Sequence, residues 1–465
     1  MTITRKRTQI IALLAILSAW VAWNTQTGDR PLVTAQAQQP PADTWTTPEA
    51  QRLGIRLLET RDASGAPAYP VAPGDLLYFT NSGTDYASKN AKNSVVVINA
   101  RTKQPIAMSD LDDHYAEGYS SHGIGLSPDG KYIYLPNLES INGAGTRTPN
   151  ATLILDARTL KIRQVIASGG TPHHAKIYRD PAGRSRVFIE DWTWNTAAAN
   201  GKAFYALDPA DNNKVVGGMT AGDVHGATYT GFTTPDGKFL YASVPPPFRG
   251  QLVSTVQGWV AKIDLETWQV VQAIPMKRYP LWTVFSKDGR WAWVSSAYEE
   301  TVAKIQRGIA PRERDTVVAE VKTGPGPYGL RLNIDDKELW VADKGELGPK
   351  DGATITIVDT ETNTVKRTLA TNCIRNDHIV MSPDGSEMWA ACNSSFEVVV
   401  LDAKTYAIKN RIPMPNLGDS HGGVFVQYRG TSPVQLTAEV VSDINGLQGS
   451  ALDAYVKGTP WVAAR

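Results

Sequence analysis

The chain has 465 residues, of which 47 are Lys or Arg and 46 are Asp or Glu. A net charge this close to zero gives no support for nucleic acid or an anionic membrane surface as a partner. Charged residues make up only 20% of the chain, which contains 39 Gly, 29 Pro, 17 Tyr and 13 Trp, and this composition indicates an all-β protein with many turns.

The N-terminus has the pattern of a secretory signal peptide. Three basic residues at 5–7 precede an apolar run from Ile10 to Trp23, and the small residues Ala35 and Ala37 suit a signal peptidase. We expect a signal peptide over 1–37, an extension over 38–74, and a periplasmic or secreted protein with no stable membrane span after cleavage. The long gap between Trp23 and Ala37 leaves an uncleaved anchor as the alternative, and in both cases the folded part lies outside the cytoplasm.

Three short β-patterns follow, at 75–82, 93–100 and 103–110. Each is an apolar run bounded by turn-forming residues, which is typical of short strands. Lys89 and Lys92 stand in the long loop between the first two patterns. A lysine there, such as Lys89, is a candidate for binding an anion above the channel, and the ordinary alternative is a solvated loop lysine.

A strand–turn–strand unit then recurs six times along the chain. Its copies begin at His122, His174, His225, Leu281, Tyr328 and Asp377, with turns of the Ser-Pro-Asp-Gly type in the first and last. Most copies are followed by a second hairpin with Asp at its turn, such as ATLILDARTLKIRQVIA from Ala151. Four strands in each unit of about 50 residues predict a β-propeller blade.

The number of units predicts a closed ring. Six complete units run from His122 to about Met414, and a lone inner strand at 421–428 begins a seventh with no later partner. The three strands before His122 supply the rest of that blade, which leaves no free blade edge. The sequence therefore predicts an all-β, seven-bladed β-propeller over 75–430 and a C-terminal extension over 431–465, with a short capping helix at 446–457.

The chain has two cysteines, Cys373 and Cys392, which flank the turn at 382–385. A cross-strand disulfide and two reduced, buried thiols both fit this placement. Their spacing is not that of metal ligands.

Six of the seven histidines fall at the start of an inner strand, in five different blades: His122, His173, His174, His225, His378 and His421. The first residues of every inner strand line one mouth of the channel, so we expect these imidazoles to converge. Such a site without thiolates favours copper, iron or zinc. Asp223, Asp377 and Asp419 lie close in sequence and are candidates to orient a ligand histidine or to bind the metal directly.

The alternative is that each histidine is structural and holds its own blade together. That alternative predicts one histidine per blade, but the fourth and fifth blades carry Leu281-Trp282 and Pro327-Tyr328 instead, which favours an asymmetric site walled by aromatic rings. Strand alternation sends only one of His173 and His174 inward, and we favour His174. His122 lies five residues before the turn residue Ser127, whereas His378 lies four residues before Ser382. Successive strand residues face opposite sides, so at least one of the two histidines needs a β-bulge to face the channel. His114 is expected in a loop, and the predicted site omits Glu190 and Asp191.

Segments 95–99, 354–359 and 398–402, with the Ser-Pro-Asp-Gly turns, resemble the YVTN repeat family of secreted propellers over roughly residues 75–428. The histidine pattern resembles the copper-holding propellers of nitrous oxide reductase and thiocyanate dehydrogenase, and the haem-carrying propeller of periplasmic nitrite reductase. The resemblance to thiocyanate dehydrogenase is closest. It implies that Lys89 and Asp223 are acid–base or substrate-positioning groups, and that the ligands are His122, His174, His378 and His421. The resemblance implies histidines at the positions of Trp282 and Tyr328, and their absence here favours one or two metal ions over three.

Three functions follow from these patterns. The first is a periplasmic copper-dependent oxidoreductase, with Lys89, Asp223 and Asp377 as catalytic groups, acting on a small inorganic or sulfur-containing substrate and passing electrons to an acceptor such as cytochrome c. The second is a haem-binding or haem-maturation propeller, in which Lys89, Lys277 or Arg278 meets a haem carboxylate. The third is a non-catalytic binding module. The sequence has no Gly-rich phosphate loop, G-x-S-x-G, C-x-x-C-H or H-E-x-x-H motif.

Overall fold

The computed structural model describes residues 45–83, 91–111, 113, 115, 121–137, 151–168, 170–191, 202–245, 257–308, 313–432 and 435–463. They belong to one compact unit, residues 39–465. The predicted signal peptide, Lys89 and His114 lie outside the described residues. Among the residues described, no helix is both long and apolar enough to cross a bilayer.

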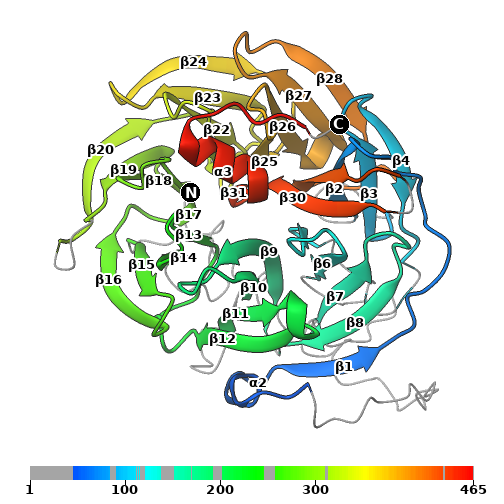
Figure 1. Ribbon diagram of the computed structural model, residues 1–465. Coiled ribbons are helices and arrows are strands. Elements are labelled where there is room, and N and C mark those ends of the chain that lie inside the picture. The colour runs from blue at the N-terminus through cyan, green and yellow to red at the C-terminus, as the bar shows by residue number, and fades with distance from the viewer. Residues whose placement is uncertain are drawn as a thin grey trace, which may run out of the picture. The chain divides into compact units, whose positions relative to one another are not determined.

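Seven antiparallel sheets form the blades of a β-propeller (Figure 1), which confirms the predicted fold class. Six of them are built from consecutive strands. In chain order these are β5 (Gly125–Leu126), β6 (Tyr132–Pro136), β7 (Ala151–Asp156) and β8 (Ile162–Ala167); β9 (Pro172–Arg179), β10 (Ser185–Asp191), β11 (Lys202–Asp208) and β12 (Lys214–Thr220); β13 (Gly231–Thr233), β14 (Phe239–Val244), β15 (Trp259–Asp264) and β16 (Gln269–Pro275); β17 (Pro280–Phe285), β18 (Trp291–Ser296), β19 (Thr301–Gln306) and β20 (Thr316–Lys322); β21 (Pro327–Leu332), β22 (Glu338–Asp343), β23 (Thr354–Asp359) and β24 (Thr364–Ala370); and β25 (Asn376–Met381), β26 (Glu387–Cys392), β27 (Glu397–Asp402) and β28 (Ile408–Pro413).

The turn chemistry explains why the hairpins recur. The Oγ atom of Ser127 accepts a hydrogen bond from the backbone N–H of Tyr132 at 2.9 Å, and Gly130 takes the left-handed conformation with φ 64°. Ser382 and Gly385 repeat this arrangement in the sixth full blade. Because glycine adopts a positive φ without steric cost, each Pro-Asp-Gly sequence closes its hairpin at a fixed place.

The seventh blade joins the two ends of the chain, as predicted. Its inner strand β29 (Gly423–Arg429) pairs antiparallel with β2 (Leu76–Ser82), and β3 (Ser94–Asn99) and β4 (Gln104–Met108) complete it. The C-terminal part of the chain therefore supplies the inner strand of this blade, and the N-terminal part supplies the outer ones.

The segment before the propeller is attached to its rim. Helix α2 (Pro48–Leu53) is capped by the side chain of Thr47. Strand β1 (Arg56–Thr60) then pairs with β8 as a fifth, outermost strand of the first full blade.

The expectation that the inner strand at 421–428 has no later partner is wrong. Strand β30 (Thr437–Asp443) pairs with β29 on its axial side, and the short β31 (Gly446–Leu447) and helix α3 (Gly449–Lys457) follow. We call these three elements the C-terminal tail. In Figure 1 the tail crosses the centre of the ring. The tail lacks the recurring strand–turn–strand sequence of the blades. It is not part of a four-stranded repeat, because it contacts the ends of several blades.

Cys373 and Cys392 form a disulfide, which decides between the two alternatives left by the sequence. Cys392 ends β26, and Cys373 lies just before β25. The bond therefore fixes the polypeptide immediately before Asp377 and His378.

Candidate metal centre

Five imidazoles from four blades meet at one mouth of the channel. His122 precedes β5, His173 and His174 begin β9, His378 lies in β25 and His421 precedes β29. Each is at most 2% exposed. Ring centroids are 4.1 Å apart for His122 and His421, 3.8 Å for His173 and His174, and 5.1 Å for His174 and His378. Residues nearly 300 positions apart in the chain are thus in contact because the blades close into a ring.

A β-bulge at the start of the inner strand explains how adjacent residues both reach this cluster. In β9, Pro172 pairs with Asp191 and Ala175 with Ile189, so His173 and His174 together face the single residue Glu190. The same one-residue shift occurs at the start of β25, where Asp377 and His378 face one residue of β26, and also in β17 and β21. A bulge turns two consecutive side chains toward one side, which regular alternation forbids. The prediction that only one of His173 and His174 points inward is therefore wrong.

Buried carboxylates orient two of the rings. Glu190 Oε2 lies 2.7 Å from His174 Nδ1, and Asp377 Oδ2 lies 2.6 Å from His421 Nδ1. A carboxylate accepts the Nδ1 proton, which fixes the tautomer and leaves the Nε2 lone pair available for a metal ion. His173 Nδ1 lies 3.1 Å from the backbone carbonyl of Tyr229, which orients the third ring in the same way.

Two buried lysines accompany these carboxylates. Lys176 Nζ donates to Glu190 Oε1 at 2.6 Å and to the carbonyl of Gly231 at 2.9 Å. Lys344 Nζ lies 3.3 Å from both Asp377 and Glu346. Each buried carboxylate therefore has a lysine beside it. Burial nevertheless raises the pKa of Glu190 and lowers the pKa of Lys176, so this pair shares a proton more readily than an exposed pair does.

The electrostatics keep the imidazoles neutral. Burial lowers the pKa of His122, His173 and His174 well below 6.5, and neighbouring imidazoles and lysines lower the pKa of these rings further. Burial also lowers the pKa of His378 to about 3. For Asp377, burial acts to raise the pKa, but His378, Lys344 and His421 outweigh it, so the pKa lies well below its ordinary value. Neutral imidazole and ionised carboxylate are the protonation states that bind a metal ion.

Ligand atoms cluster at the spacing that an ion requires. One set is His122, His174 and His378, and another is His122, Asp377 and His421, with the ligand atoms of each set within 4.8 Å of one another. Two nitrogens bound to one ion lie roughly 3–4 Å apart. Neither ring nitrogen of His378, nor His174 Nε2, has a hydrogen-bond partner among the described residues. Buried polar atoms are rarely left in that state, so this donor set fits a metal ion.

Aromatic side chains close the other side of the cluster, in the two blades that lack a histidine. Tyr328 stacks on His378 with ring centroids 5.5 Å apart, and its hydroxyl lies 3.0 Å from His122 Nε2. Trp282 lies 4.5 Å from His378, and Tyr229 hydrogen-bonds to Tyr328 at 2.7 Å. The predicted asymmetric arrangement of imidazoles and aromatic rings is therefore present.

Two predicted site residues lie elsewhere. His225 and Asp223 are exposed in the turn between β12 and β13, where His225 has φ 58° and Asp223 binds Thr220. Among the described residues, neither belongs to a ligand-sized group. In the third blade the position equivalent to His122 is Tyr229, five residues before Thr234, and its ring lies 4.9 Å from that of His173. His225 lies four residues earlier in the chain, in the turn.

Three residues of the site were not predicted: Glu190, Lys176 and Lys344. Lys176 of β9 pairs with Phe188, and Glu190 lies two residues further along β10, so the side chains of Lys176 and Glu190 lie on the same side of the sheet. The sequence signal was a charged pair inside two otherwise apolar strands. Lys344 follows β22, and no sequence pattern placed it near Asp377.

No protein-family model matches this chain, and no curated protein matches it. Solved structures do. Periplasmic gluconolactonase from Pseudomonas aeruginosa is 16% identical with a TM-score of 0.54 and covers 75% of this chain and 99% of its own. Hydrazine synthase from Kuenenia stuttgartiensis is 18% identical with a TM-score of 0.50 and covers 66% of this chain and 89% of its own.

A putative 6-phosphogluconolactonase from Bacteroides uniformis is 16% identical with a TM-score of 0.51 and covers 74% of this chain and 98% of its own. These likenesses establish the fold alone. Proteins with different activities share this propeller, so the function must be argued from the site.

Proposed function

We propose that the chain is a metal-dependent oxidoreductase, with copper as the metal, acting on a small inorganic or sulfur-containing substrate at the histidine mouth of the channel. One observation carries this proposal: five buried imidazoles and a buried aspartate from four blades converge at ligand spacing. A structural role for each histidine does not explain why they meet at one point while two blades have none.

Copper is favoured by the donor set. Imidazole nitrogens dominate, and the cysteines are bound to each other and offer no thiolate. Among divalent first-row metals, a site of this kind binds copper most tightly. His122, His174 and His378 would hold one ion, and His122, Asp377 and His421 a second; because the two sets share His122, one or two ions fit. A bound copper ion would supply one-electron transfer, so that the substrate is oxidised and an external acceptor reduced.

The chain's own residues prepare the site for this chemistry. Glu190 and Asp377 hold the rings of His174 and His421 in one tautomer, and the aromatic wall excludes water. Lys176 and Lys344 pair with the buried carboxylates Glu190 and Asp377 beside the cluster.

Two further parts of the proposal concern the surroundings. The disulfide fits an oxidising compartment, which supports a periplasmic or secreted location and a soluble electron carrier such as cytochrome c as acceptor. Haem is the less favoured cofactor, because imidazole rings 4.1 to 5.9 Å apart lie in contact and suit separate ions better than a porphyrin.

Metal analysis tests the proposal. Protein purified without chelators and loaded with copper should carry about one or two copper ions per chain, and H378Q should lose most of this copper while keeping its β-sheet circular dichroism. H225N is the matched control, because His225 is exposed and Asn tolerates its positive φ; it should retain full copper content. A Soret band would establish haem instead. A folded wild-type protein that binds neither metal nor haem would contradict the proposal and favour a non-catalytic binding module.

Activity gives the second measurement. Copper-loaded protein should reduce cytochrome c in the presence of thiocyanate or sulfite, and H378Q should abolish this reduction. Equal rates for the loaded wild type and H378Q would contradict a redox role for the cluster.

A further inference from the structure

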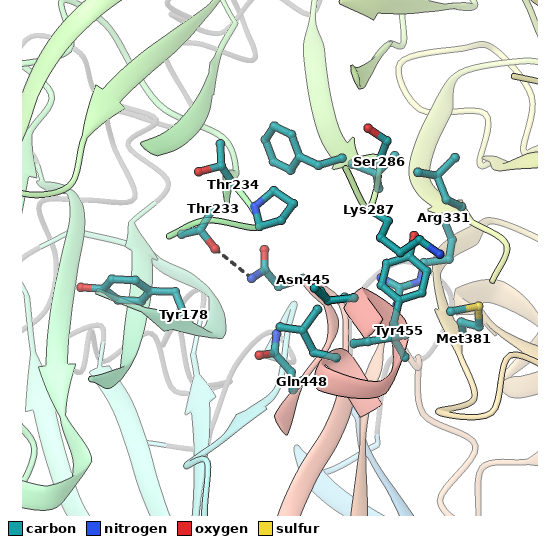
Figure 2. A pocket seen from close by; sticks show the side chains of 18 of the residues that line it. Tyr178, Thr233, Thr234, Ser286, Lys287, Arg331, Met381, Asn445, Gln448 and Tyr455 are labelled. Carbon is teal, nitrogen blue, oxygen red and sulfur yellow. Dashed lines mark hydrogen bonds between the residues drawn. The ribbon is translucent and has the colours of Figure 1, made fainter. Parts of the chain in front are cut away.

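A second cavity lies at the opposite mouth of the channel, away from the histidines. It is formed by the C-terminal ends of inner strands and by the C-terminal tail, and its volume is about 110 Å³. One water molecule needs about 10–15 Å³ measured this way, so the cavity accommodates a small molecule. Figure 2 shows tail residues Asn445, Gln448 and Tyr455 beside blade residues Thr233, Ser286 and Arg331.

Arg331 lines this cavity with a buried guanidinium. The residue is 6% exposed, and its Nε atom has no hydrogen-bond partner. Nor does the guanidinium form an ion pair within 4 Å of any carboxylate among the described residues. An unpaired buried cation is costly, because burial removes its hydration without replacing it. Proteins usually keep such a destabilising group only at a functional site.

Nearby carboxylates do not satisfy Arg331, because each is already engaged. Asp443 accepts the backbone N–H groups of Asn445 and Gly446 and the side-chain amide of Gln448. Asp336 is bound by the hydroxyl of Tyr455 and the backbone N–H of Lys287. These carboxylates act on the charge of Arg331 at longer range, and Arg331 is among the residues that line the cavity.

Asn445 provides a buried hydrogen-bond acceptor, in addition to the donors of Arg331. Its Nδ2 atom donates to the carbonyl of Ile177 at 3.0 Å and to Thr233 at 3.1 Å (dashed in Figure 2), which fixes the orientation of the amide. Its Oδ1 atom is then buried without a partner in the described structure. An occupant of the cavity is thus required to accept hydrogen bonds from Arg331 and to donate one to Asn445.

We propose that this cavity is a binding site for a small hydroxy- or aminocarboxylate. The planar guanidinium matches a carboxylate through two parallel hydrogen bonds, and the hydroxyl or amine donates to Asn445 Oδ1. The site lies about 10 Å along β21 from Tyr328 of the histidine cluster, because three residues of a strand separate Tyr328 from Arg331. It is a second site and does not depend on the proposed copper chemistry.

Probe molecules test the chemistry directly. Glycolate and glycine should bind the wild-type protein saturably in calorimetric titrations and raise its Tm with concentration, since a ligand of the folded state stabilises it. Acetate, which lacks the donor, should bind about tenfold more weakly. The absence of saturable binding by glycolate and glycine would overturn the proposal, and equal affinities for acetate and glycolate would overturn the role of Asn445.

Substitution of Arg331 separates a binding role from a structural one. R331M should weaken glycolate binding about 50-fold or more while leaving the Tm of the ligand-free protein unchanged or higher, because an unpaired buried charge is removed. R290M, at an exposed arginine outside the cavity, is the matched control and should bind like the wild type. Unfolding of R331M, or undiminished binding by it, would overturn the proposal. Copper content should be unchanged in R331M, so failure of this site and failure of the proposed function are distinguishable.

Discussion

Asp377 connects the cations and imidazoles of the histidine cluster. Its carboxylate accepts from His421 and lies 3.3 Å from Lys344 and 3.5 Å from His378. D377N should weaken copper binding about 10- to 100-fold, because the tautomer and orientation of His421 are no longer fixed. It should also lower stability toward the lower end of about 3–5 kcal/mol, since Lys344 loses the carboxylate charge of Asp377. Competition with a chelator and urea unfolding measure both effects; D223N, at an exposed carboxylate, should change neither.

The buried histidines also predict how the metal-free protein responds to acid. The folded-state pKa of each of four imidazoles lies below the unfolded value of 6.5, so the unfolded chain binds more protons at lower pH. Stability should therefore be fully present above about pH 6.5 and be lost as pH falls toward 3, by up to about 1.4 kcal/mol per pH unit for each imidazole. Urea unfolding at pH 8, 6 and 4 checks this, and H378Q should give a shallower slope. A stability that is constant from pH 8 to 4 would contradict neutral buried rings.

At the residue scale, sequence reasoning identified most of the cluster but not its supporting charges. The imidazoles were found because they recur at one place in a repeat, which is a local signal. Lys344 was not found, because its proximity to Asp377 depends on the angle between neighbouring blades. His225 was assigned to the cluster because it begins the hairpin segment of the third blade. It lies nine residues before Thr234, whereas His122 lies only five before the equivalent Ser127, so His225 falls in a turn away from the cluster.

At the scale of single elements, the disulfide holds the strand that carries Asp377 and His378. Asn393 follows Cys392 directly, and its amide lies 3.2 Å from His421. The double substitution C373S and C392S removes the cross-link that closes a loop in the unfolded chain. Because the unfolded chain gains conformational entropy, the free energy of unfolding should fall by about 3 kcal/mol. Guanidinium unfolding measures this, and wild-type protein treated with a reductant is the control that should reproduce the loss. An unchanged stability in both samples would show that the cross-link does not constrain the unfolded chain.

The strands themselves were predictable to a large extent, because turn residues and apolar alternation are properties of short segments. Pro-Asp-Gly turns and Asp-containing hairpins located the blades. The bulges at the starts of β9, β17, β21 and β25 were not predictable one by one, since no residue type marks them. They arise where an inner strand leaves its sheet to line the channel, so the need for a bulge could be inferred but not its position.

At the scale of the whole molecule, the C-terminal tail joins blades that are distant in sequence. Ser442 donates to the carbonyl of Met381, and Asn445 binds Ile177 and Thr233. A chain ending at residue 430 should melt at a lower temperature, because these links and the pairing of β30 with β29 are lost. Its copper content should equal that of the full chain, since the tail lies at the other mouth. Loss of copper from a folded truncated protein would contradict this separation of the two mouths.

The ring is joined by strands from its two ends, and this sets the order in which the protein matures. The backbone N–H of His421 lies 3.4 Å from Oδ1 of Asn81, so the first propeller strand and the residue that opens the last one meet beside the imidazoles. During synthesis, roughly 340 residues separate the appearance of these two partners. A ribosome-bound fragment therefore lacks His421, and under the proposed function a bound ion would be held by the set of His122, Asp377 and His421 only after release of the polypeptide and formation of its final blade.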